Sequence, residues 1–289
     1  MSELQTILAP DFLLRNSLYA GCVVGVACPL VGVYFIMRRM IFLGVALPQI
    51  SSAGIALAFF LHGLGLHFLP HATEEHWMVL VGSLTLTGSA LFLLAVLERR
   101  ARAGTEARIG VAYVMATAAS ILMIAASPHG EAHVLSLLKG EIVAVSDQSL
   151  SILMGGYALV VAALIACYRE LLLVSYDRDM AIALGRRSGA WDVALFTIIG
   201  LTISLGVMTV GPLVVFAMLL IPPLAALRLV RGMVHISVLA AVIGVGSALV
   251  GFYVSFRYDL PLGPTDAVVA GCVFGIALVV APWVRGFRG

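Results

Sequence analysis

Two groups of histidines and carboxylates in this chain have side chains that could bind a metal ion. One group follows residue 61 and the other lies near residue 130: His62, His67, His71, Glu74, Glu75 and His76; His129, Glu131 and His133. Imidazole and carboxylate groups together are ligands for zinc or manganese. None shows the close spacing of a site built on one helix, so two interpretations stay open. These residues form a metal-binding loop, or they line a membrane interface.

A second candidate is the polar interruption GVALPQISSAG at residues 44–54. Pro48 removes a backbone hydrogen bond, and Gln49 offers an amide that could contact a solute. Packing of small and polar residues between helices explains the same pattern. Of these two interpretations, contact with a solute on a transport path or packing between helices, Gln49 favours the transport path.

These residues lie in or between apolar runs long enough to cross a bilayer. The chain has 289 residues, of which 62% are hydrophobic and 11% charged, with a mean hydropathy of +1.09. A hydrocarbon core of about 30 Å requires about twenty apolar residues in a helix. The runs predict nine membrane helices at 17–37, 42–64, 77–97, 109–127, 150–168, 191–209, 211–230, 234–256 and 266–284. Eight would result if the sixth and seventh runs formed one segment.

The basic residues indicate how the chain is oriented. Fourteen of the seventeen lie in alternate gaps between the runs or at the C-terminus: Arg38, Arg39, Arg99, Arg100, Arg102, Arg108, Arg169, Arg178, Arg186, Arg187, Arg228, Arg231, Arg285 and Arg288. Cytoplasmic loops of membrane proteins are rich in arginine and lysine. We therefore expect a multi-pass membrane protein with the N-terminus outside and the C-terminus in the cytoplasm.

Residues 128–149 are too polar to span the bilayer and too apolar for a free loop. We expect a short re-entrant or interfacial helix there, protected by neighbouring protein. Glu141 lies in this segment, and an ionisable group at membrane depth is costly and usually functional.

The stretch GPLVVFAMLLIPP predicts further helix breaks. Gly211 and Pro212 begin the seventh run, and Pro222 and Pro223 lie near its other end. Proline kinks or ends a helix, so together with Pro48 these residues are the predicted breaks. Kinked helices are common at the centre of transporters, and a purely architectural role fits equally.

The longest cytoplasmic gap, residues 168–192, is amphipathic and charged at both ends. Asp177 and Asp179 suit a helix start, Ala181 and Ala183 favour helix, and Gly185 can end it. The pattern predicts about two turns of exposed helix. Such a helix could dock a cytoplasmic partner, and an ordinary surface loop is the alternative.

Composition limits what the chain can do alone. No stretch is polar enough for a separate soluble domain, so residues 1–289 form a single transmembrane domain of all-α class, a polytopic helix bundle. Motifs of hydrolases and proteases are missing from the sequence, and we expect no enzyme activity and no bound cofactor. A net charge of +2 gives no basis for nucleic-acid binding.

Six segments, in order, resemble the permease subunit of ABC-3 metal importers, a family that takes up zinc, manganese or iron. They cover most of the chain: GVYFIMRRMIFLGVAL with AGIALAFFL, ARIGVAYVMATAASILMI, LLKGEIVAVSDQSL, DRDMAIALGRR, VGPLVVFAMLLIPPLAALRL and DLPLGPT. The resemblance implies a homodimer of permeases, a pair of cytoplasmic ATPases that bind ATP, and an extracytoplasmic solute-binding protein. It also implies that the helix at Asp177–Gly185 seats in the ATPase as a coupling helix.

The second helix departs from the family pattern. Family members usually carry an aspartate there and a histidine four residues later, on one helix face. The corresponding positions here are Val45 and Gln49, and Pro48 replaces the usual serine. Two explanations remain: Gln49 and Glu141 line a weaker metal path, or the cargo is a chelate or another small solute. A secondary transporter driven by an ion gradient is the rival in another class.

Overall fold

The chain folds into a bundle of long helices, as the apolar runs predict. The computed structural model describes residues 14–64, 74–100, 105–126, 145–186 and 188–286. Nine helices in these ranges are long and apolar enough to cross a membrane, and no strand occurs in them. The prediction of nine spans is confirmed.

The spanning helices agree with the predicted runs to within a few residues at most ends. They are α2 (Arg15–Met37), α3 (Ile41–Gly63), α4 (Glu74–Arg100), α5 (Thr105–Ala125), α7 (Asp147–Ala166), α10 (Ser188–Val210), α11 (Pro212–Leu229), α12 (Met233–Tyr258) and α13 (Leu262–Gly286). Two short helices, α8 (Tyr168–Tyr176) and α9 (Arg178–Ala183), lie between α7 and α10.

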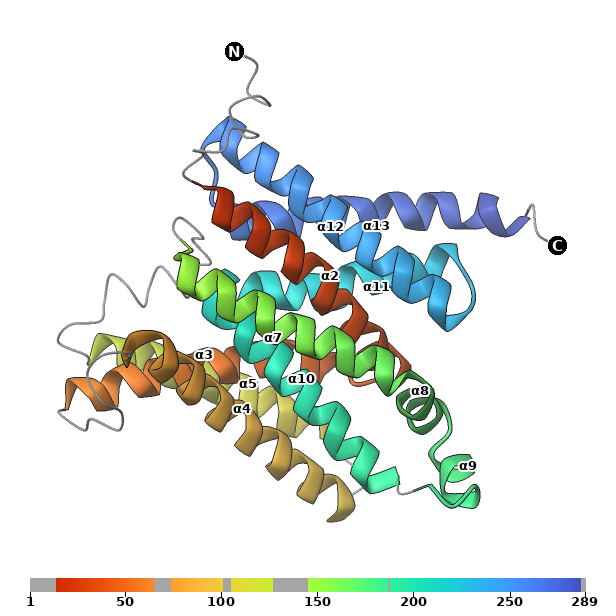
Figure 1. The fold of residues 1–289 in the computed structure, drawn as a ribbon, viewed down its shortest axis with the longest axis horizontal. Coiled ribbons are helices and arrows are strands. Elements are labelled where there is room, and N and C mark those ends of the chain that lie inside the picture. The colour runs from red at the N-terminus through yellow and green to blue at the C-terminus, as the bar shows by residue number, and fades with distance from the viewer. Residues whose placement is uncertain (1–13, 65–73, 101–104, 127–144, 187, 287–289) are drawn as a thin grey trace.

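The helices form two groups around a buried centre. In Figure 1, α2 runs beside α12, with α11 and α13 nearby, while α3, α4 and α5 gather on the opposite side. Helix α10 packs against both groups, through α2 and α7 on one side and α3 and α4 on the other. Over half of each spanning window is buried in α2, α3, α10 and α11, against less than a third in the other five spans.

Polarity is arranged for a lipid environment. Large apolar side chains such as Phe92, Ile165 and Trp283 are exposed, whereas hydroxyls such as Ser51, Ser83 and Thr202 are buried. In lipid the helices gain little from hiding apolar surface, so close packing and interhelical hydrogen bonds hold them together. The Ser51 and Ser83 hydroxyls, 2.6 Å apart between α3 and α4, form one such bond.

Glycines allow three helix pairs to approach at backbone distance. A Cβ added to Gly25 of α2 would lie 2.9 Å from the carbonyl of Gly244 of α12, and one on Gly244 would strike the Gly25 carbonyl. Gly32 of α2 likewise faces the Leu219 carbonyl of α11, and Gly54 of α3 faces Gly82 of α4. Small residues at such crossings permit the tight packing that membrane helices require.

A single residue, Gly211, separates α10 from α11. Its φ of +83° and ψ of 163° suit glycine, and Pro212 occupies the first turn of α11, where its missing N–H costs nothing. The sixth and seventh runs are therefore two helices, which settles the choice between eight and nine spans.

The other predicted breaks do not end a helix. Pro48 lies inside α3, and Pro222 and Pro223 lie inside α11, which continues to Leu229. Unpaired backbone groups are costly in lipid, so a spanning helix is continued past a proline wherever neighbouring helices support it. Of the predicted breaks, only Gly211 and Pro212 coincide with a helix boundary.

We predict that Gly244→Ala weakens the bundle, because its methyl group would strike the backbone of α2. Overpacking of this kind costs about 1–3 kcal/mol, visible as a lower melting temperature of the purified protein in detergent. Gly246→Ala, on the same helix with no atom within 4 Å of the added Cβ, is the matched control. Equal melting temperatures for the two variants would contradict the proposed contact.

Candidate functional site

The predicted exposed helix exists, but as the second of two short helices. Asp177 caps α9 and accepts a hydrogen bond from the Met180 N–H at 2.9 Å. Gly185, with φ +72°, donates to the Ile182 carbonyl at 2.9 Å just after the helix ends. The helix from Arg178 to Ala183 has six residues, shorter than two full turns, and its limits agree with the predicted capping residues.

Helix α8 was not predicted. It follows α7 after Cys167 and buries Leu171 and Val174 against the bundle. A nine-residue amphipathic helix is too short and too polar to be found by a search for spans. It holds α9 at one end of the molecule (Figure 1).

Helix α9 presents apolar side chains outward. Met180, Ile182 and Leu184 are 54%, 54% and 59% exposed, while Ala181 is fully buried. Two large exposed apolar side chains on this six-residue helix and a third on its C-cap residue, Leu184, lie beside the exposed Asp177 and Asp179 and are typical of a surface that another protein covers.

Arg38, at the end of α2, connects this element to the membrane helices. Its Nε donates to Ser175 Oγ of α8 at 3.1 Å, and its Nη1 lies 2.7 Å from Asp192 Oδ1 of α10. The guanidinium also lies 5.9 Å from the centre of the Phe196 ring. Since the Arg38 and Asp192 side chains are only 12% and 16% exposed, the pair is well shielded from solvent, and removing one partner costs more than it does in a surface ion pair.

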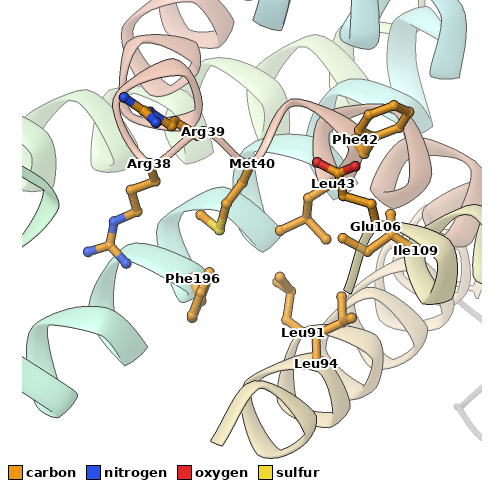
Figure 2. Close-up of a pocket in the computed structure, with 10 residues that line it drawn as sticks. All are labelled: Arg38, Arg39, Met40, Phe42, Leu43, Leu91, Leu94, Glu106, Ile109 and Phe196. Atoms are coloured by element: carbon orange, nitrogen blue, oxygen red, sulfur yellow. The ribbon is translucent and has the colours of Figure 1, made fainter. Parts of the chain in front are cut away.

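Arg38 also borders a cavity of about 240 Å³ formed by the turn between α2 and α3 with α4, α5 and α10 (Figure 2). Leu91, Leu94 and Phe196 line its apolar wall, and Glu106 lies across the cavity from Arg38. Arg39, in the turn, has φ +56°, a conformation that costs a non-glycine residue about 1–2 kcal/mol. The surrounding contacts therefore hold this turn in place.

An ion pair connects the end of α9 back to the start of α8. Arg186, after α9, pairs with Glu170 of α8 at 3.2 Å, with side chains 54% and 23% exposed. This surface pair contributes little to stability, but it ties the two ends of the α8–α9 segment together.

Of the predicted path residues, only Gln49 lies within the described structure. It is half-buried on α3, one turn from Val45. Glu141 and the predicted re-entrant segment up to residue 144 lie outside the described residues, as do His67, His71, His129, Glu131 and His133. Among the described residues, no group of three or more His, Cys, Asp or Glu could hold a metal ion.

Sequence reasoning missed Asp266, one turn into α13. It is 1% exposed, and its Oδ1 has no hydrogen-bond partner among the described residues. Gly251 of α12 leaves the space that this carboxyl fills, and Cys22 of α2 lies within electrostatic range of it. An acidic residue inside an apolar run is the signal that could have identified it.

The comparisons with known proteins agree with this architecture. Residues 11–281 match the family described as "ABC 3 transport family". A match over nearly the whole chain defines the class: this chain belongs to the ABC 3 transport family and is a multi-pass membrane component of a transport system.

Two relatives resemble the chain over almost its full length. The "Manganese import system permease protein ScaB" of Streptococcus gordonii is 24% identical over 272 residues, 94% of this chain and 92% of the relative. The "Manganese transport system membrane protein MntC" of Halalkalibacterium halodurans is 28% identical over 269 residues, 93% and 87% of the two chains.

One solved structure has the same fold. A chain of "PsaBC from Streptococcus pneumoniae in complex with Fab" superposes with a TM-score of 0.85 and 23% identity, covering 99% of this chain and 98% of that one. The all-α bundle predicted from the sequence is thereby confirmed.

We predict that Arg38→Met and Asp192→Asn each destabilise the protein by about 2–3 kcal/mol. The value is below that of a fully buried pair because both side chains keep some exposure. Each single variant removes the opposite charge that the other side chain faces, so the double variant should cost less than the sum of the two single losses. Thermal unfolding of all four proteins in detergent measures the coupling, and strictly additive losses would rule out the pair.

Proposed function

We propose that this chain is the membrane permease of an ATP-driven importer for a divalent metal ion, with manganese as the first cargo to test. Two copies of the chain, a pair of cytoplasmic ATPases and an extracytoplasmic binding protein would complete the system in a bacterial inner membrane. ATP would bind to the partner ATPase, since this chain offers no soluble domain for it.

The near full-length similarity to two proteins named for manganese transport carries this proposal. Identity of 24–28% spread over more than nine-tenths of the chain supports a shared architecture and the same kind of task. The cargo depends instead on the residues of the transport path, and these differ from the family pattern.

The α8–α9 segment supports the role of coupling to an ATPase. It is short, exposed and apolar on its outer side, and the arginine pattern assigns its gap to the cytoplasm. Arg38 would carry its displacement to α2 and α10, which belong to the buried centre. Movement of α9 by the ATPase would then shift the bundle between two states with different contacts.

The metal path is where this chain departs from the family pattern. Val45 offers no ligand, and Gln49 offers a neutral amide oxygen on the half-buried face of α3. A neutral oxygen binds a hard divalent cation more weakly than a carboxylate does. Selection by the binding protein would then decide the cargo, and the permease would provide passage.

The direct test is reconstitution of the chain with its ATPase and binding protein in liposomes. We expect accumulation of manganese that requires ATP and the binding protein. Uptake by the chain alone under an ion gradient would establish a secondary transporter instead. Uptake of a chelated metal without uptake of the free ion would establish a chelate importer.

In this assay we predict that Gln49→Ala slows manganese uptake about five- to tenfold. The loss corresponds to one polar contact of roughly 1–1.5 kcal/mol. Gln148→Ala, at an exposed position near the start of α7, removes the same amide away from the path and should leave uptake unchanged. An unchanged rate in Gln49→Ala would remove this residue from the path.

We predict that Ile182→Asp weakens binding of the ATPase at least fivefold, about 1 kcal/mol or more, because it places a charge in the centre of an apolar docking surface. Co-purification of the two subunits and ATP-dependent uptake would both fall. Ile182→Leu keeps the apolar contact and serves as the control. Normal assembly of the Asp variant would show that the ATPase seats elsewhere.

A further inference from the structure

An apolar groove lies between α8 and the helices of the bundle. Its volume is about 690 Å³, and α2, α8, α11 and α12 all contribute to it. Figure 1 shows α8 beside the end of α2. Pockets for small ligands span about 300–1,000 Å³, so the groove is large enough for a hydrocarbon chain.

The walls of the groove are almost entirely hydrocarbon. They comprise Val33, Ile36, Met37, Leu172, Leu173, Pro223, Leu227, Met233 and Ile236. Gly232 and Tyr176 complete them near the mouth, and Tyr176 is 83% exposed. A tyrosine at such a position is typical of the boundary between hydrocarbon and headgroups.

The one charged residue among those that line the groove is basic. Arg169 lines it and is exposed, with no ion pair among the described residues. Arg228 and Arg231, both exposed, adjoin Leu227 and Gly232 of the lining in sequence. None of the lining residues is acidic. Of the two acidic residues that adjoin the lining in sequence, Glu170 is paired with Arg186, and Asp177 accepts a hydrogen bond from the Met180 N–H of α9.

We propose that this groove binds one anionic phospholipid of the cytoplasmic leaflet. An acyl chain would occupy the apolar walls, and the phosphate would lie at Arg169. The arginine pattern places α8 on the cytoplasmic side, where a basic pocket between membrane helices meets anionic headgroups. The charge of Arg169 selects this occupant over a neutral apolar helix from another protein.

The bound lipid would fill the space between α8 and the bundle, and it would support the α8–α9 segment on the side that faces the bundle. This inference goes beyond the proposed import function, and binding can be measured without ATP or cargo. A failure of either proposal can therefore be recognised by itself.

The test is native mass spectrometry of the purified transporter complex titrated with dioleoylphosphatidylglycerol or dioleoylphosphatidylcholine. We expect one tight site for the anionic lipid and weaker binding of the zwitterionic one. Arg169→Gln should weaken binding of phosphatidylglycerol about fivefold, the effect of one arginine near an anionic headgroup. Arg108→Gln, on α5 outside the groove, is the control and should bind as the wild type does.

A second pair of variants tests the hydrocarbon walls. Leu173→Trp would narrow the groove and reduce tight binding of phosphatidylglycerol, whereas Leu159→Trp, at an exposed position of α7, should not. Equal affinity for the two lipids, or equal binding by the Arg169 and Arg108 variants, would overturn the proposal. Disulfide cross-linking of Leu173→Cys to a second permease or to the ATPase would show a protein occupant and overturn it too.

Discussion

The structure depends on one constraint: lipid offers no hydrogen bonds to a polypeptide backbone. Each spanning segment must therefore pair its own N–H and C=O groups, and helices are retained through Pro48 and through Pro222 and Pro223. The connection between α10 and α11 is accordingly reduced to Gly211, where glycine accepts a positive φ and the following proline needs no hydrogen-bond acceptor. Polar contacts between helices are therefore made by side chains at helix ends and at helix crossings.

The contacts around Arg38 are an example of polar contacts made at a helix end. A charged side chain at the end of a spanning helix can reach polar partners without entering the hydrocarbon, and Arg38 reaches both α8 and α10. One residue thereby joins an exposed element to the most buried part of the bundle. A displacement of α8 would therefore be felt directly at α10 through the contacts of this one side chain.

Helix number and approximate limits were predictable because spans of about twenty apolar residues have few alternatives. The caps of α9 were predictable from Asp177 and Gly185, whose local preferences are strong. The partners of Arg38 were not, because Ser175 and Asp192 are 137 and 154 residues away in the chain. Asp266 escaped notice because it follows the turn DLPLGPT and its burial depends on Gly251 of the preceding helix.

The glycine crossings restrict how the bundle can deform. Gly25 and Gly32 interlock α2 with α12 and α11 at two levels, and Gly54 with Gly82 does the same for α3 and α4. Within each set the backbones are in close contact at these glycines, so sliding of one helix along its neighbour would bring side chains into contact with backbone atoms. Helix α10 packs against both sets, so a relative movement of the two sets along α10 would leave these backbone contacts intact.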